Sequence, residues 1–233
     1  MANYPLLWRR TRPPERSGTG RPPRLTVDEV VAAAIRIADA NGLEAASMAR
    51  VAADLGVATM TLYTYVPSRA DLIDLMVDEA QLERTLINPE KSDSVRRFAA
   101  QTTTMFTKHP WLTEVTLARP PLGPGTMRER EFMIAAMTHR GLPTDRINRA
   151  ANALTAYIYA FAREAGENAR LKRITGQTTE SWWQEHSDFW ENWFDVDAHP
   201  AMTALWNAGG FEGDQAQDAF EYGLDLLLRG LVE

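Results

Sequence analysis

The sequence contains no cysteine, so it can form neither a disulfide framework nor a metal site built from thiolates. It also lacks any apolar run that approaches the roughly 20 residues needed to cross a bilayer. The first residues place apolar side chains before arginines, which is the reverse order of a secretory signal. We therefore expect a cytoplasmic protein with no membrane partner.

The motifs of common enzyme classes are missing as well. The four histidines, at positions 109, 139, 186 and 199, do not have the spacing of metal ligands. No Gly-x-Ser-x-Gly motif occurs, and the stretch "GTGRPP" is not preceded by a strand as a phosphate-binding loop requires. We therefore expect no enzyme activity, no metal and no cofactor.

The charge is unevenly distributed along the chain. The net charge is −6 at pH 7, yet residues 1–25 hold six arginines and one glutamate, and residues 71–233 carry a net charge of −9. A basic end joined to an acidic body favours a phosphate-facing end and a body with a different task.

The first 24 residues are rich in proline, arginine, glycine and serine and show no helical or strand periodicity, which predicts a flexible basic arm. Its arginines lie at positions 9, 10, 12, 16, 21 and 24. Arginines separated by proline and glycine are typical of a segment that enters the minor groove of DNA. Two alternatives remain open: a disordered tail, or residues before about Gly20 that precede the true start.

Beyond the arm, the apolar spacing predicts an all-α protein. "TVDE" at Thr26–Glu29 forms a capping box, and Ser47 and Ser68 stand at further N-cap positions. Helices are predicted at about 26–41, 47–55, 59–65, 69–86, 93–108, 112–118, 125–140, 144–173, 179–194, 199–207 and 214–231. The predicted domains are the arm at 1–24, a three-helix head at 25–70 and a helical body at 71–233.

The second and third helices have the pattern of a helix-turn-helix. Ala52 is small where the two helices cross, Gly56 tolerates a turn with positive φ, and Leu62 points inward. The outward side of the third helix then presents Thr59–Thr64, whose hydroxyl and methyl groups suit phosphate oxygens and thymine methyl groups. A plain α-hairpin with a solvated threonine face is the alternative.

The segment Leu25–Met76 resembles the head of the TetR-type transcriptional regulators, including the Gly-Val-x-x-x-Thr-Leu-Tyr core at Gly56–Tyr63. The stretches "KHPWLTEV", "ARPPLGPGTM", "HRGLPTDRINRAANAL" and "ITGQTTESWW" are similar to the C-terminal class named after the tetracycline repressor. The resemblance covers approximately residues 26–230.

This resemblance implies a set of DNA-binding residues on the second, third and fourth helices. They are Ser47, Thr59, Met60, Thr61, Tyr63, Thr64, Tyr65 and Arg69. Thr61 and Tyr63 would contact phosphate, whereas Thr59 and Met60 would meet bases. Arg69 replaces the lysine usual in the family, and Ala49 stands where tetracycline repressors have a base-reading arginine, so we expect a different operator preference.

The resemblance also implies an effector pocket in the body. Its candidate residues are Met105, His109, Trp111, Met133, Met137, Asn152, Tyr157 and Phe161, with Thr155 as a further polar group. Aromatic and methionine residues at helical spacing usually form a core, and that alternative remains open. Val115 and Thr85 replace the metal-liganding histidines of tetracycline repressors, which favours a different small organic effector.

Two further segments are candidates for contact with a second chain. "SWWQEHSDFWENWF" at Ser181–Phe194 is the most aromatic stretch and is wider than the face that a lone surface helix buries. The last helix, with Phe220 and Leu231 near its ends, joins Ala151–Arg163 as the candidate dimer face. Core packing is the alternative for the aromatic stretch.

Together these observations predict a homodimeric transcriptional repressor that binds a double-stranded DNA operator and is released by a small-molecule effector. The alternative is an all-α ligand-binding or interaction protein whose head no longer binds DNA.

Overall fold

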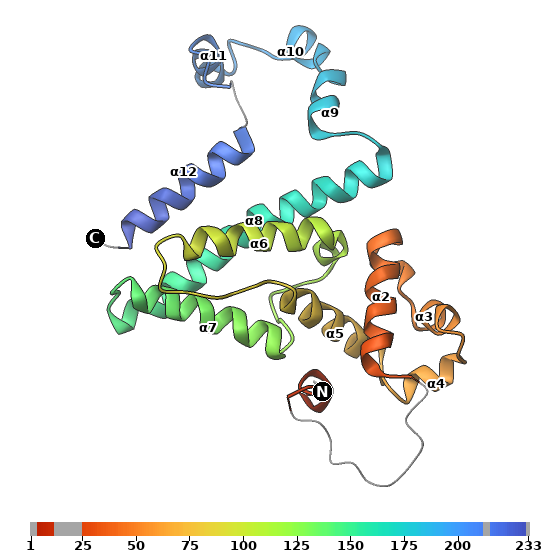
Figure 1. The fold of residues 1–233 in the computed structure, drawn as a ribbon. Coiled ribbons are helices and arrows are strands. Elements are labelled where there is room, and N and C mark those ends of the chain that lie inside the picture. Colours follow the sequence, from red (N-terminus) through yellow and green to blue (C-terminus); the bar gives the residue numbers. More distant parts are fainter. Residues whose placement is uncertain (1–3, 12–24, 212–214, 232–233) are drawn as a thin grey trace, which may run out of the picture. The chain divides into compact units, whose positions relative to one another are not determined.

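The computed structural model describes residues 4–11, 25–211 and 215–231. Among these residues the fold is all-α, which confirms the predicted fold class, and they include no β-strand (Figure 1). The chain forms two compact units, residues 1–167 and 168–233. No helix in the described ranges is long and apolar enough to cross a membrane.

The head begins with α2 (Val27–Asn41), which the predicted capping box initiates. The Thr26 side chain accepts a hydrogen bond from the backbone N–H of Glu29, whose carboxylate accepts one from the backbone N–H of Thr26. This exchange satisfies two N–H groups that the first turn of a helix leaves free. The helix ends at Gly42, whose φ of 86° few other residues would adopt.

Two short helices complete the head. They are α3 (Met48–Asp54), capped by the Ser47 side chain, and α4 (Thr59–Tyr63), and they pack against each other. The single 3-10 turn η1 (Leu43–Ala45) connects α2 to α3. The third helix is shorter than the predicted 59–65, because the chain turns at Thr64 before the Val66-Pro67 pair.

Helix α5 (Arg69–Leu82) joins the head to the body. The Ser68 side chain caps it, as predicted, and it ends before the predicted Leu86. It packs against α2 on one side and α7 (Pro124–His139) on the other (Figure 1). Any shift of α5 therefore affects both parts of the first unit.

The other long helices of the first unit are α6 (Ser94–Lys108), α7 and the part of α8 (Thr144–Thr175) up to residue 167. Phe98 of α6 stacks on Phe132 of α7 with 6.1 Å between the ring centroids. Both phenylalanines are buried, and Ile158 of α8 is buried as well. Large apolar side chains from three helices thus form the core of the body.

The helix predicted at 112–118 is wrong. The chain forms the 3-10 helix η2 (Pro110–Glu114) and then continues to residue 123 without a regular helix. The physical reason is that Pro120 and Pro121 follow, and a residue before proline is driven out of the helical region. This irregular segment, residues 115–123, becomes one wall of the cavity described below.

The second unit contains α9 (Thr179–Glu185), α10 (Asp188–Asn192), α11 (Pro200–Asn207) and α12 (Gln215–Gly230). The single helix predicted at 179–194 is wrong, because the helix stops at His186. The His186 ring stacks on Trp182 and lies 2.7 Å from its carbonyl oxygen through Nδ1. The backbone N–H of His186 donates to the same carbonyl, and the N–H of Ser187 then donates to Gln184, three positions back, at 3.3 Å, so the last turn tightens where α9 ends.

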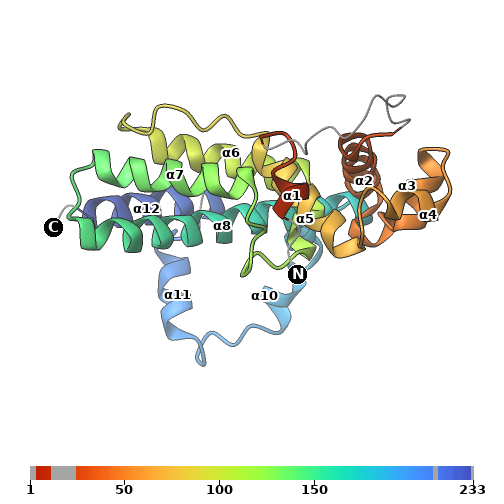
Figure 2. The same ribbon diagram turned by 90° about the horizontal axis from the view of Figure 1, so that it is seen from below.

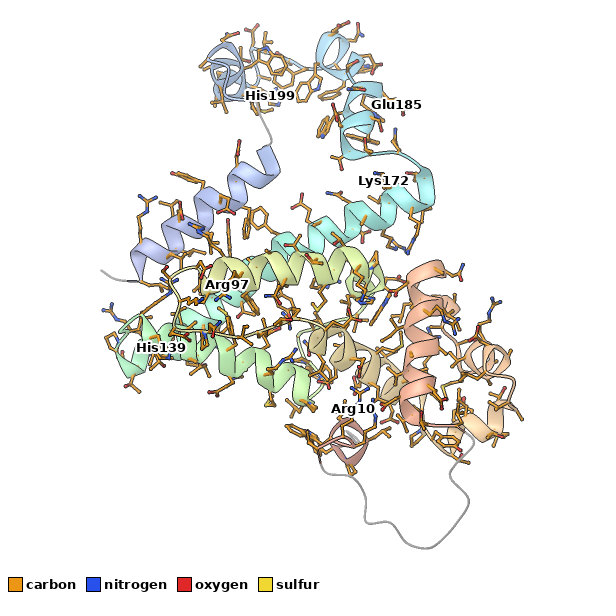
Figure 3. The ribbon with its side chains drawn as sticks, viewed as in Figure 1. Arg10, Arg97, His139, Lys172, Glu185 and His199 are labelled. Carbon is orange, nitrogen blue, oxygen red and sulfur yellow. The ribbon has the colours of Figure 1, made fainter. Side chains whose placement is uncertain are left out.

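The aromatic stretch of this unit packs largely against itself. Trp190 lies against Trp183 and Trp206, and Phe194 stacks on His199, which Figure 3 labels just before α11. Trp193 remains 75% exposed. The described part of this unit therefore has a broad aromatic surface.

The predicted flexible arm contains an ordered element. Residues Tyr4–Leu7 form one helical turn, α1, which packs on α5 (Figure 2). Leu7 is buried, which accounts for the order of a segment that composition alone marks as flexible. The other arginines of the arm, at positions 12 to 24, lie outside the described residues.

Candidate nucleic-acid interface and effector cavity

The turn between α3 and α4 has the geometry that the sequence pattern predicted. Ala52 is buried at the crossing, and its carbonyl accepts a 3.0 Å hydrogen bond from the backbone N–H of Val57. Gly56 adopts a φ of 65°. Leu62 is fully buried and is the only residue of α4 that points into the core. The pose of α4 thus depends on this one leucine and on the turn.

The remaining side chains of α4 face solvent. Met60 is 75% exposed and Tyr63 is 40% exposed, while Thr61 is also exposed and Thr59 is half-buried. The outer surface of α4 is therefore uncharged and carries hydroxyl, methyl and thioether groups. Such groups can donate to phosphate oxygens and contact thymine methyl groups without attracting all polyanions equally.

Other predicted DNA-binding residues are already engaged within the head. The Thr64 hydroxyl donates to the carbonyl oxygen of Thr61 at 2.6 Å, and half-buried Tyr65 packs against the core. The Ser47 hydroxyl accepts from the backbone N–H of Arg50. Arg69 donates to the carbonyl oxygen of Leu43 at 3.2 Å. These four side chains hold the head together at the edge of the exposed surface.

A cavity of about 900 Å³ lies in the body between α5, α6, α7, α8 and the segment 115–123. Its walls include small or apolar residues of α8 and of the segment, namely Leu117, Ala118, Pro120, Leu122, Ala151, Ala156 and Ala160. A volume of this size accommodates a drug-sized organic molecule.

The structure separates the predicted pocket residues into two groups. Met133 and Asn152 line the cavity, as does Thr155. The others lie outside this lining: Met105, His109, Trp111 and Met137 are buried in the core, while Tyr157 and Phe161 are half-buried with ring centroids 5.0 Å apart. Most of the predicted aromatic and methionine residues therefore lie in the core, as the alternative interpretation of the sequence expected, and not in the wall of the cavity.

A buried ionic network supports the polar side of the cavity. The Arg84 guanidinium, with 2% of its side chain exposed, pairs with Glu129 and donates to the Thr102 hydroxyl at 3.0 Å. The Tyr159 hydroxyl donates to Glu129 at 2.6 Å. Burial and the neighbouring Glu129 raise the pKa of Tyr159, so that its hydroxyl remains a donor. Glu129 and Tyr159 both line the cavity and are held rigidly by this network.

Sequence reasoning missed several lining residues. Tyr159 and Arg163 line the cavity together with Asn152 and Thr155. These positions recur at intervals of three and four along α8, so helical periodicity from Asn152 is the signal that identifies them. Gln81, Glu114 and Arg130 lie on other elements, and no local pattern brings them to this site.

His109 and Trp111 meet the head rather than the cavity. His109 Nδ1 lies 2.7 Å from Asp39 of α2, and its Nε2 lies 3.1 Å from Glu83 at the end of α5. The Trp111 indole also donates to Asp39, at 2.8 Å. Burial lowers the pKa of His109, but hydrogen bonds to the two carboxylates outweigh it and hold that pKa above its ordinary value. His109 therefore joins α2 to the body through both of its ring nitrogens.

A helix-turn-helix with an exposed outer helix, joined through one connecting helix to a body with a ligand-sized cavity, defines a class: the DNA-binding regulators. The profile of the bacterial regulatory proteins of the tetR family matches residues 30–76, and that of the tetracyclin repressor-like C-terminal domain matches residues 88–233. The chain belongs to the TetR family of DNA-binding transcriptional regulators.

Individual relatives agree with this assignment. The chain is 37% identical over 232 residues to the HTH-type transcriptional repressor DrrR1 of Streptomyces coeruleorubidus, covering 97% of this chain and 83% of that one. The TetR-family protein ActR of Streptomyces coelicolor in complex with actinorhodin is 27% identical, with a TM-score of 0.74 over 90% of this chain and 98% of ActR. ActR in complex with (S)-DNPA gives 26% identity and a TM-score of 0.71 over 90% of this chain and 98% of ActR.

Proposed function

We propose that this regulator is a homodimeric cytoplasmic repressor that leaves its DNA operator when a small organic molecule fills the body cavity. The observation that carries the proposal is the pairing of an exposed, uncharged α4, fixed by one buried leucine, with a cavity of about 900 Å³ in the same unit. The 37% identity to a transcriptional repressor supports repression, and ActR supports a ligand in the cavity.

The DNA-contacting residues in this proposal are the exposed side chains of α4 and their neighbours. Thr61 and Tyr63 contact phosphates, and Thr59 and Met60 contact bases. Two heads of a dimer would read two half-sites spaced about 34–36 Å apart, one turn of DNA. Apolar residues of Ala151–Arg163 and of α12 form the proposed dimer face, and Leu226 and Tyr222 of α12 are exposed in the single chain.

The lining of the cavity favours an effector with an apolar body and several oxygen atoms. Apolar groups dominate its walls, while Arg130, Arg163 and Asn152 offer hydrogen-bond donors from the α7–α8 side. Actinorhodin and (S)-DNPA are suitable first probes, because ActR binds them and shares 26–27% of its residues with this chain.

Binding to the intergenic DNA that flanks its own gene, measured by fluorescence anisotropy, tests the proposal. We expect one dimer per two-fold site and release of the DNA by a molecule that occupies the cavity. Ala156→Trp, which fills the cavity, should abolish the response to that molecule while the head remains folded. A protein that binds no such duplex, even at low salt, would instead be an all-α ligand-binding or interaction protein.

A further inference from the structure

The N-terminal segment, residues 4–10, lies on the first unit where three of its parts meet. Helix α1 packs on α5, and Leu7 is buried while Leu6 and Trp8 are partly buried against the core (Figure 2). Burial of this kind holds a single helical turn that would be unstable alone. We name residues 4–10 the N-terminal strap.

One end of the strap holds the start of the head. Arg9 donates through Nε to Asp28, in the first turn of α2, at 2.8 Å, and Arg10 reaches the same carboxylate at 3.1 Å. Arg10 also pairs with Glu79 of α5 at 2.9 Å, and Figure 3 shows it on the side of α1 that faces these helices. Burial raises the pKa of Asp28, but the two guanidinium groups outweigh it and hold the pKa below its ordinary value.

The other contact of the strap is with the wall of the cavity. The Trp8 indole N–H donates to the carbonyl oxygen of Leu122 at 2.9 Å, across 114 positions of sequence. Leu122 lines the cavity and belongs to the irregular segment 115–123. Directly after that segment, the first turn of α7 is fixed to α5, because Asp78 accepts a 2.8 Å hydrogen bond from the backbone N–H of Gly125.

Three consecutive residues thus connect the first turn of α2, the connecting helix α5 and the irregular wall of the cavity. An irregular segment has no backbone ladder of its own, so its position depends on such outside contacts. A ligand that displaces Leu122 must break or carry the Trp8 hydrogen bond, and the same segment of chain bears the arginines that hold Asp28.

We propose that the N-terminal strap couples the cavity to the DNA-binding head, with Trp8 as a positioning residue for the cavity wall and Arg9 and Arg10 as the contact with α2. This inference rests on the proposed function, since it assigns a route by which occupancy of the cavity changes the head. In this proposal the docked strap favours the DNA-binding arrangement of the head.

This role differs from the predicted entry of the arm into a minor groove. Arg9 and Arg10 are paired with carboxylates of α2 and α5, so they are not available to phosphates while the strap is docked. The prediction of DNA contact therefore stays with the arginines at positions 12 to 24.

Hydrogen exchange of the free protein tests the coupling: one contact of the strap is removed, and the exchange of backbone amides near its other contact is measured. Trp8→Phe keeps an aromatic ring but removes the indole donor, and we expect about five-fold faster exchange in the first turn of α2, whose Asp28 is bound by Arg9 and Arg10. Arg10→Ala should speed exchange of the Gly125 and Thr126 amides, and Arg10→Lys should restore most of the protection. Arg36→Ala, which removes an ion pair to Asp54 within the head, is the matched control.

Exchange that changes only within residues 4–10 would show a local structural contact and would overturn the inference. The DNA measurement is separate: Trp8→Phe should weaken binding to the flanking intergenic duplex about five-fold, with the structure of α4 unchanged. If the wild type binds no DNA, the proposed function fails while the exchange data still decide the coupling. If the wild type binds and Trp8→Phe binds equally well, the coupling fails alone.

Discussion

The outer face of the head, formed by α3 and α4, and its inner face, where α2 meets α5 and η2, are built from different interactions. On the outer face one buried leucine fixes a short helix whose other side chains remain exposed. On the inner face His109 links Asp39 and Glu83, which are 70 and 26 positions away in sequence. The outer face can change its side chains with little cost to folding, whereas the inner face determines how the head is held.

The largest effect is expected from Leu62→Ala, which removes the one core contact of α4. Deleting a fully buried leucine side chain typically lowers the free energy of unfolding by about 2–5 kcal/mol. Urea denaturation measures this loss, and DNA binding should fall with it. Met60→Ala, two positions earlier and mostly exposed, should change stability by less than about 0.5 kcal/mol. Equal effects of the two substitutions would contradict the description of the outer face.

On the inner face, His109→Leu leaves Asp39 and Glu83 without their shared partner and should lower the free energy of unfolding by about 2 kcal/mol. The folded-state pKa of His109 is raised, so its contribution is complete below about pH 6.5 and is lost as the pH rises through that higher value. Lys108 also pairs with Glu83, at 2.5 Å. Denaturation at several pH values should show this slope in the wild type and not in the variant.

A gain in stability is expected where α5 meets α7. Burial raises the pKa of Asp78 to about 6, although hydrogen bonds from Gly125 and Thr126 oppose the rise. The folded state therefore binds the proton more tightly, and the contribution of Asp78 to stability falls as the pH rises from about 4 to about 6. Asp78→Asn keeps an acceptor and should be more stable at pH 7 by on the order of 2 kcal/mol. Thermal unfolding of the wild type and the variant should show this gain at pH 7 and not at pH 4. Equal stabilities at pH 7 would show that the pKa of the Asp78 carboxyl is not raised.

The smallest effects on folding are expected from the exposed residues of α4. Thr61→Ala and Tyr63→Ala should each weaken DNA binding about five-fold on every sequence tested, while unfolding stays within about 0.5 kcal/mol of the wild type. Thr59→Ala should instead change the preferred bases. Anisotropy titrations on a set of single-base operator variants separate the two behaviours, and identical profiles for all three substitutions would argue against the assignment of roles.

The same contrast explains what could be predicted from the sequence. The caps at Thr26, Ser47 and Ser68 and the turn at Gly56 depend on residues a few positions apart, and the structure confirms them. The placement of His109 depends on Asp39, from another helix far away in sequence. Local patterning therefore predicts the outer face well and cannot predict the inner one.

Two predicted helices, at 112–118 and 179–194, are wrong because the periodicity of apolar residues does not show where a helix must end. The segment 112–118 has helical spacing of apolar residues, but the prolines at 120 and 121 prevent a helix from continuing, and the β-branched Thr113, Val115 and Thr116 disfavour one. In the aromatic stretch, α9 ends at Glu185 and α10 begins at Asp188, with the N–H of Ser187 donating to Gln184 at 3.3 Å, although the apolar pattern continues through both helices. For the cavity, burial alone did not distinguish core from lining, because Met133 and Met137 lie one turn apart on α7 with only Met133 in the lining.

Four alanines, at positions 118, 151, 156 and 160, contribute to the wall of the cavity. Each of these side chains consists of a single methyl group, so every larger residue there would reduce the volume of the cavity. Such a change would leave the buried ion pair of Arg84 and Glu129 in place. Related regulators could therefore diverge in the molecules they sense through a few such exchanges, while retaining the same repertoire of operators.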